Sequence, residues 1–384
     1  MLERLRHLSR RLPLRPATAF TVLGMAAALV APSLSDAATG RHGPTAYTGP
    51  IAYAAGSRGG PIAYAAGSRH ATRRARPAGA RAAGALPPQG LYEECAPSDQ
   101  AQCAGELATM GGAGFRLAVN YTAWYGSAAQ IQAYAAEAQT AGVKIIWPLD
   151  YAAWRDPGTA SSLPSEYSDL TPDCGCATNA AFVQYAISLV RSLPATWGYY
   201  IGDELDPSQA PEVAALAAAV RALDPGHPLL YVGQGGPQTT DNLRPFESMA
   251  GTVGADVYPI GQDVPTSYVG GVATDVGRLS SSAHTHPAMV LQAFSWGQYP
   301  TELQAPAPRW PTSTEMRQMR DQALLAKPSM ILWYSLKDIN DSPDPQAHWH
   351  DLVTAAFAAA PVQRTTKAAR ATAAGVRRHR SRRR

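Results

Sequence analysis

Residues 197–206 read WGYYIGDELD, an apolar run that ends in two adjacent carboxylates, Asp203 and Glu204. Gly202 allows the backbone to turn, and Pro207 cannot donate the hydrogen bond that would continue a strand. The pattern predicts a buried strand of a parallel sheet. In parallel α/β proteins, ligands bind beyond the carboxyl ends of the strands, so Asp203 and Glu204 are candidates for acid/base chemistry.

Further strand patterns alternate with helical patterns on both sides of this stretch. The expected strands cover residues 90–95, 115–121, 143–150, 197–206, 228–233, 255–260, 288–294 and 329–336. The expected helices cover residues 101–110, 127–140, 179–192, 211–223, 241–249, 268–281, 312–325 and 349–357. Eight strands alternating with eight helices over about 270 residues predict a single (β/α)8 TIM barrel, an α/β fold, at residues 89–362.

An open, doubly wound sheet is the alternative architecture. Its first strand would be followed by a glycine-rich turn that binds a nucleotide phosphate, and no G-x-G-x-x-G follows a strand here. The barrel is therefore preferred, and no cofactor is expected.

The first 37 residues have the three parts of an export signal. Residues 17–31 are apolar, and residues 35–37 have the small-x-small spacing of a cleavage site. The basic start contains Arg4, Arg6, Arg10, Arg11 and Arg15, and the sequence around Arg10 weakly resembles a twin-arginine signal. The apolar run is shorter than the roughly 20 residues that cross a bilayer, so we expect a cleaved signal peptide and a secreted protein rather than a membrane anchor.

Residues 38–88 and 363–384 have compositions that cannot form a packed core, and we expect both to be disordered. The first segment is a low-complexity Gly-, Ala- and Arg-rich linker in which GPIAYAAGSR occurs at 49–58 and again at 60–69. The second is a basic tail with nine Lys and Arg residues and no acidic residue. The tail would either contact anionic cell-wall polymers or lipid headgroups, or only add solubility.

The net charge of +4 conceals a segregation of charge along the chain. Residues 89–363 hold 12 basic and 27 acidic residues, a net charge of −15. An acidic body disfavours nucleic acid as the main partner.

Four cysteines in an exported chain predict disulfide bonds. Cys95 and Cys103 would close a short loop, and Cys174 and Cys176 lie in a Cys-Gly-Cys turn, but three connectivities are open. A zinc site is the competing interpretation. No second Cys/His pair stands at ligand spacing, so no metal is expected.

The residues at the predicted strand ends share a chemistry that suits sugars. Carboxylates move protons, amides bind hydroxyl groups, and flat aromatic side chains stack on pyranose rings. The residues predicted to act in catalysis are Glu204, Asp203 and Asp256. Those predicted to bind substrate are Glu93, Asn120, Tyr121, Asp150, Tyr258, Gln292, Trp296 and Trp333.

With these residues in place, the stretch 90–358 resembles the superfamily of (β/α)8 glycoside hydrolases that includes cellulases and β-galactosidases. The resemblance implies an acid/base glutamate at the end of strand four, usually after an asparagine, where Asp203-Glu204 stands here. It also implies a tyrosine near strand six and a tryptophan at the end of strand eight, matched by Tyr258 and Trp333. The run 309–333 resembles a segment common in hydrolase-like barrels of unassigned substrate.

Strand seven departs from that family pattern, because Gln292 stands where the nucleophilic glutamate is implied. An amide cannot act as a carboxylate nucleophile. Three interpretations remain open. Another carboxylate (Asp256, Asp150 or Glu93) serves as base or nucleophile, or an N-acetyl group of the substrate does so with Gln292 orienting it, or the site binds sugar without cutting it.

We therefore predict a secreted glycoside hydrolase with Glu204 as the general acid and Asp203 tuning it. The alternative is a non-catalytic, carbohydrate-binding or wall-associated barrel. In a purely structural role, Glu204 would cap the following helix or pair with an arginine such as Arg116. We expect a carbohydrate partner, no specific nucleic acid, and a monomer.

Overall fold

The computed structural model describes residues 85–150, 173–176, 178–299 and 305–359. The predicted signal peptide, the linker up to residue 84 and the basic tail lie outside these residues. Within the described ranges, no helix combines the length and the apolar character that crossing a bilayer requires.

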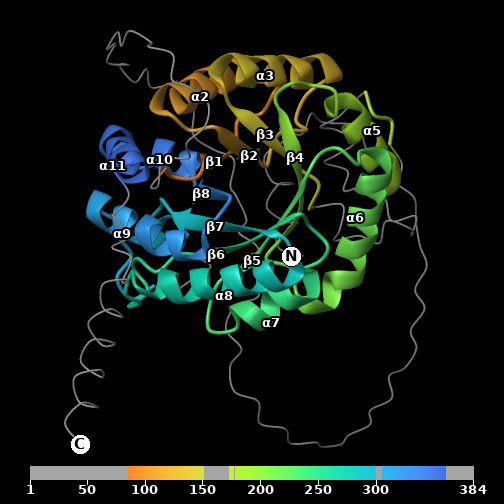
Figure 1. Cartoon of the computed structure of the whole chain (residues 1–384). Helices are drawn as coiled ribbons and strands as arrows, with labels where there is room; N and C mark the ends of the chain where they lie inside the picture. The colour runs from red at the N-terminus through yellow and green to blue at the C-terminus, as the bar shows by residue number, and fades with distance from the viewer. Residues whose placement is uncertain (1–84, 151–172, 177, 300–304, 360–384) are drawn as a thin grey trace, which may run out of the picture. The chain divides into compact units, whose positions relative to one another are not determined.

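Eight parallel strands form a closed barrel in sequence order, and β8 pairs with β1 to complete it (Figure 1). The strands are β1 Gln89–Glu93, β2 Leu117–Asn120, β3 Lys144–Pro148, β4 Thr196–Asp203, β5 Leu229–Gln234, β6 Thr252–Val257, β7 His286–Gln292 and β8 Met330–Tyr334. The predicted (β/α)8 barrel is confirmed, and the open sheet is excluded because no edge remains unpaired.

Helices surround the barrel wall, as Figure 1 shows. They are α2 Gln100–Ala113, α3 Ala128–Ala141, α5 Asn179–Val190, α6 Ala210–Leu223, α7 Thr239–Leu243, α8 Tyr268–Ala283, α9 Ser313–Ala323, α10 Leu336–Asn340 and α11 Pro345–Phe357. The predicted helix 241–249 is divided into α7 and a 3-10 turn, Arg244–Phe246, because Pro245 removes a helical hydrogen bond. Helix α10 was not predicted.

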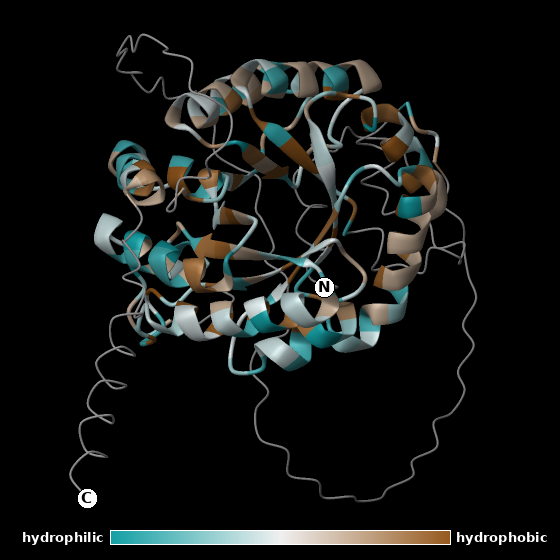
Figure 2. Cartoon of the chain, in the orientation of Figure 1, coloured by the Kyte–Doolittle hydropathy of each residue, from teal (hydrophilic) through white to brown (hydrophobic). Residues whose placement is uncertain are grey.

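Side chains of each strand alternate between the helices and the barrel interior. Leu91, Trp147, Ile201 and Leu291 belong to the core between the strands and the helices. Apolar residues accordingly follow the strands in Figure 2, and hydrophilic ones gather on the outer turns of helices such as α9. Strand residues that face the helices are part of the core. A site can therefore be formed only by the polar residues that face the barrel interior at the carboxyl ends of the strands.

An irregularity in the pairing of strand β4 determines which way its last side chains point. Its pairing with β5 shifts between Tyr200 and Gly202. A Cβ atom on Gly202 would lie 2.6 Å from the ring of Tyr231, so only glycine fits there. The shift brings Tyr200 and Asp203 to the same interior side, and Glu204 follows with φ at 48°. Such a backbone costs a non-glycine residue about 1–3 kcal/mol and is concentrated at functional sites.

Candidate active site

Tyrosine rings from several strands meet inside the carboxyl end of the barrel. The ring of Tyr92 on β1 lies 5.2 Å from Tyr334, 5.5 Å from Tyr121 and 6.2 Å from Tyr200, measured between centroids. Tyr258, just after β6, lies 5.9 Å from Tyr334. These five rings form an aromatic cluster at the carboxyl end of the barrel.

Two tyrosines of this aromatic cluster donate hydrogen bonds to Asp203, one to each carboxylate oxygen. The Tyr121 hydroxyl donates to Oδ2 at 2.5 Å, and the Tyr200 hydroxyl donates to Oδ1 at 2.7 Å. The Tyr92 hydroxyl donates in turn to the Tyr200 oxygen at 3.2 Å. Asp203 is therefore fixed between strands β2 and β4.

Glu204 and Asp256 form a carboxyl pair across strands β4 and β6, joined by a side-chain hydrogen bond. Asp256 is 5% exposed, and its Oδ1 also accepts from the backbone N–H of Gly235 at 3.2 Å. Burial raises the pKa of Asp256, while the hydrogen bonds from Glu204, Gly235 and Tyr258 oppose that rise. Burial outweighs these hydrogen bonds, so the pKa of Asp256 stays above its ordinary value.

The charges of four carboxyl groups act on the buried tyrosines at this end of the barrel. Burial raises the pKa of Tyr258, and the charges of Asp256, Glu204 and Asp203 raise it further. Burial likewise raises the pKa of Tyr92, with contributions from Asp203, Asp256 and Asp150. The phenols consequently stay protonated: Tyr258 hydrogen-bonds with Asp256, and Tyr92 donates to Tyr200. The charge of Asp150, predicted from the end of the third strand, contributes to the raised pKa of Tyr92 and of Tyr121.

Trp296 borders the site beyond β7. Its Nε1 donates to the backbone carbonyl of Tyr258 at 3.3 Å, and its ring lies 6.2 Å from the Tyr258 ring. Only 5% of the residue is exposed. Trp296 therefore supports the ring of Tyr258 and has little surface of its own to offer a ligand.

Three predicted substrate residues face the helices instead of the barrel interior. Glu93 contacts Tyr134 of α3, and Asn120 Nδ2 donates to the Cys95 carbonyl at 2.8 Å. The Trp333 side chain is fully buried, and its Nε1 donates to Gln89 Oε1 at 2.9 Å. The prediction that these three bind substrate is wrong, because the alternation along a strand turns each away from the site.

In each of the three strands the interior position is held by an adjacent tyrosine: Tyr92, Tyr121 and Tyr334. Tyr92, Tyr200 and Tyr334 are the site residues that the sequence analysis missed. For Tyr92 and Tyr334, a tyrosine in the last two positions of the strand was the available indication.

Gln292 is also placed differently from its prediction. Its Oε1 accepts from the Ile260 N–H at 2.8 Å, and its Nε2 donates to the carbonyls of Ile260 and Phe294 at 3.0 and 3.1 Å. The side chain is fully buried. The substrate contact predicted for Gln292 is therefore wrong, and an amide used in this way cannot orient an N-acetyl group.

The substitution Gln292→Glu is expected to destabilise the protein and to create no new hydrolysis. A carboxylate there would face the Ile260 and Phe294 carbonyls without a donor, at a cost of roughly 2–4 kcal/mol. Urea denaturation measures the loss, with Gln234→Glu as the control because Gln234 ends β5 in a partly exposed position. A Gln292→Glu variant as stable as wild type would show that the side chain has room to leave its backbone partners.

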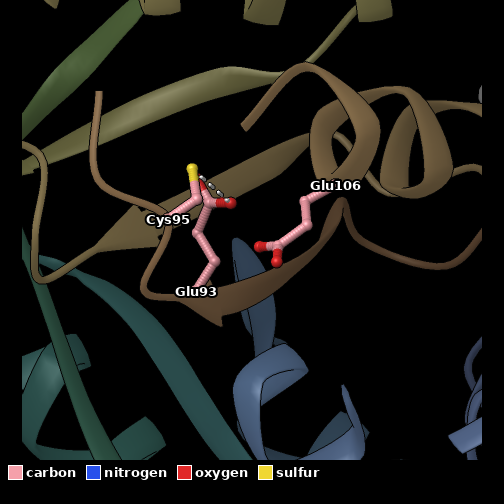
Figure 3. Close-up of side chains that lie close together, drawn as sticks. All are labelled: Glu93, Cys95 and Glu106. Atoms are coloured by element: carbon pink, nitrogen blue, oxygen red, sulfur yellow. Dashed lines mark hydrogen bonds between the residues drawn. The ribbon is translucent and has the colours of Figure 1, made fainter. Parts of the chain in front are cut away.

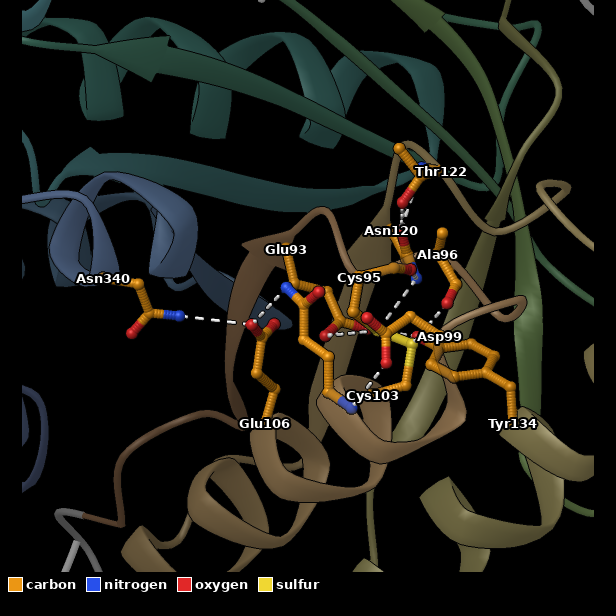
Figure 4. The surroundings of a disulfide bond; sticks show 11 residues. Glu93, Cys95, Ala96, Asp99, Cys103, Glu106, Asn120, Thr122, Tyr134 and Asn340 are labelled. Carbon is orange, nitrogen blue, oxygen red and sulfur yellow. Dashed lines mark hydrogen bonds between the residues drawn. A yellow bond between two sulfur atoms is a disulfide. The ribbon is translucent and has the colours of Figure 1, made fainter. Parts of the chain in front are cut away.

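One cluster outside the site has side chains of the kinds that bind metals. Ligand atoms of Glu93, Cys95 and Glu106 lie within 4.8 Å of one another (Figure 3). Cys95, however, is bonded to Cys103, so its sulfur is not a thiolate ligand (Figure 4). Cys174 is likewise paired with Cys176, which selects one of the three connectivities. The cluster does not fit a metal ion.

Comparisons with known proteins bear on the fold. No family model matches the chain, and no curated protein sequence matches it. A candidate alpha-L-fucosidase from Bacteroides thetaiotaomicron VPI-5482 matches with a TM-score of 0.50 and 9% identity, covering 74% of this chain and 99% of its own. An endo-1,4-beta-D-mannanase from Thermotoga petrophila RKU-1 matches with a TM-score of 0.45 and 12% identity, covering 65% and 88%.

A beta-galactosidase from the psychrophilic Marinomonas ef1 matches with a TM-score of 0.48 and 9% identity, covering 70% of this chain and 59% of its own. At such low identities a likeness concerns the fold alone. The chain thus has a (β/α)8 barrel of the kind found in solved glycoside hydrolases.

Proposed function

We propose that the protein is a glycoside hydrolase in which Glu204 is the general acid and Asp256 is its ionised partner. The hydrogen-bonded pair of Glu204 and Asp256 at the carboxyl end of the barrel carries the proposal. Active sites of (β/α)8 enzymes are built at this end from several different strands. The pair supplies one carboxyl that donates a proton and one carboxylate that carries charge, as glycoside hydrolysis requires.

The reaction follows from these two roles. Glu204 gives its proton to the glycosidic oxygen as the bond to the anomeric carbon breaks, and positive charge develops on the sugar ring. Asp256 stabilises that charge or bonds to the anomeric carbon. Water then adds to the anomeric carbon and gives a proton back to Glu204, and any bond to Asp256 breaks as it does so. Hydrogen-bond contact is closer than the roughly 5 Å of retaining pairs and the 6.5–9.5 Å of inverting pairs, so the two carboxyls must separate to admit the substrate.

The test is hydrolysis of a panel of polysaccharides and aryl glycosides by the full-length protein. The wild type is expected to cleave at least one β- or α-linked substrate, and Glu204→Gln is expected to lose that cleavage. Asp241→Asn, an exposed carboxylate on α7, is the control and is expected to keep it. Cleavage that survives Glu204→Gln would remove Glu204 from the chemistry.

A non-catalytic sugar-binding barrel is the second candidate. Gln292 favours it, because strand seven provides no carboxylate and its amide is engaged with the backbone. Calorimetry with the same glycans separates the two functions. Binding without any cleavage across the panel would support the binding barrel.

We propose further that the protein is exported with cleavage of residues 1–37 and that its partner is a carbohydrate. Two disulfide bonds support an oxidising compartment. The basic tail would contact anionic wall or membrane surfaces, and the protein would act as a monomer. Mass spectrometry of the protein recovered from culture medium is expected to find an N-terminus close to residue 38; an intact Met1 would exclude cleavage.

A further inference from the structure

Asp203 is the residue of the site with the most specific hydrogen bonding. Two hydroxyl groups from different strands donate to it, Tyr121 at 2.5 Å and Tyr200 at 2.7 Å, one to each oxygen. The Tyr200 oxygen accepts from Tyr92 at 3.2 Å. Three phenols therefore converge on a single carboxylate: Tyr121 and Tyr200 donate to it directly, and Tyr92 donates to Tyr200.

The donors are held in their neutral form. Burial raises the pKa of Tyr121 and of Tyr200 well above the ordinary value, and the charge of Asp203 is the next cause in both. A protonated phenol beside a carboxylate forms a charge-assisted hydrogen bond, which favours the ionised carboxylate. The arrangement thus stabilises a negative charge on Asp203 without a counter-charge from these partners.

We propose that Tyr121 and Tyr200 are positioning residues that hold Asp203 as a fixed anion, and that this anion stabilises the positive charge developing on the sugar ring. The inference rests on the proposed hydrolase function and extends it. The fixed anion has a second consequence, because a negative charge next to Glu204 opposes ionisation of Glu204 and keeps the acid protonated.

The position of Asp203 suits this role. It is partly exposed, it precedes Glu204 in the chain, and its charge raises the pKa of Tyr258, which lies beside Asp256. Strand seven offers no charge here, since Gln292 is bonded to backbone groups. Asp203 therefore adds a negative charge to the site from strand four in place of one from strand seven.

The chain contains a matched control on the same strand. Tyr199 points to the helix side, and its hydroxyl donates to Asp224 at 2.7 Å, the same distance as Tyr200 to Asp203. Tyr199→Phe and Tyr200→Phe each remove one phenol-to-carboxylate hydrogen bond, but only the second faces the site. A general loss of packing would affect both variants alike.

The experiment compares full-length wild type with Tyr121→Phe, Tyr200→Phe and Tyr199→Phe by two measurements. The first follows the titration of the Asp203 carboxyl by NMR with ¹³C-labelled aspartate, the signal being assigned by its absence in Asp203→Asn. Loss of either site phenol is expected to move the Asp203 midpoint upward by about one pH unit. The second is the pH profile of kcat/KM, whose acidic limb is expected to move in the same direction. Tyr199→Phe is expected to change neither.

The outcomes separate this inference from the proposed function. An Asp203 midpoint that stays in place in both site variants overturns the inference, whatever the protein hydrolyses. A moved midpoint with an unmoved rate profile also overturns it, because the anion would then play no part in catalysis. A wild type that cleaves no glycan refutes the proposed function, while the NMR midpoints still decide whether the phenols hold Asp203 as an anion.

Discussion

The protein is expected to be more stable at pH 5 than at pH 8, and Glu93→Gln is expected to reduce that difference, while Glu94, whose pKa burial also raises to about 8, maintains part of it. Glu93 has no exposed surface and lies between β1, α2 and α3 beside the disulfide (Figure 4). Tyr134 donates a hydrogen bond to one of its oxygens, and Glu106 lies close by. Burial, followed by the charge of Glu106, raises the pKa of Glu93 to about 8.

The sign of the effect follows from proton binding. In the unfolded chain a glutamate titrates near pH 4.3, so between that pH and about 8 the native state holds a proton that the unfolded state has released. The stabilisation is complete below the unfolded pKa and is lost as the pH rises through the folded pKa. At about 1.4 kcal/mol per pH unit, Glu93 accounts for up to roughly 3 kcal/mol between pH 5 and pH 8.

Urea denaturation at four pH values between 5 and 8 measures this dependence. A glutamine at position 93 keeps the shape of the side chain and the acceptor for Tyr134 but has no proton to lose. Glu247→Gln, on a partly exposed glutamate outside this cluster, is the control. Equal slopes for wild type and Glu93→Gln would show that the ionisation of Glu93 is not linked to folding.

The architecture was predictable because its determinants are local. Each strand is an apolar run bounded by a glycine, proline or carboxylate, as in residues 197–206, and the helices begin at caps such as Ser127 and Thr312. Alternation of the two patterns along the chain then leaves few topologies. The position of Asp150, Asp203, Glu204 and Asp256 at or just beyond the strand ends was predictable for the same reason.

The side of the barrel that a strand-end residue faces was harder to predict. A shift of one residue exchanges the two faces of a strand, so Glu93 and Trp333 were predicted where Tyr92 and Tyr334 face the site, and Asn120 was predicted along with Tyr121. In β4, Tyr200 faces the barrel interior, and simple alternation would turn Asp203 toward the helices. The register shift before Gly202 turns Asp203 back to the interior. The partners of Gln292 are backbone groups 32 residues away and two residues away, which no local pattern reveals.

The single variants Glu204→Gln and Asp256→Asn are each expected to lower kcat/KM by roughly 10²–10⁴, and the double variant is expected to be little worse than the poorer single. The physical reason is the shared proton. Once Asp256 is neutral, Glu204 has lost the carboxylate that completes the reaction, and once Glu204 is an amide, no proton reaches the leaving oxygen. Residues that act as one unit give non-additive losses. Two losses that multiply would show that the pair does not act together.

The leaving group of the substrate distinguishes the two roles. An aryl glycoside with a very acidic phenol departs without protonation, so on it Glu204→Gln is expected to recover most of the lost rate. Asp256→Asn is expected to remain slow on both kinds of substrate, because the positive charge on the ring develops whichever group leaves. If the rate on the activated aryl glycoside recovered in Asp256→Asn and not in Glu204→Gln, the two roles would be exchanged and Asp256 would be the general acid. Since Glu204 is the more exposed of the two and lies at the end of β4, it is the carboxyl better placed to reach a leaving oxygen.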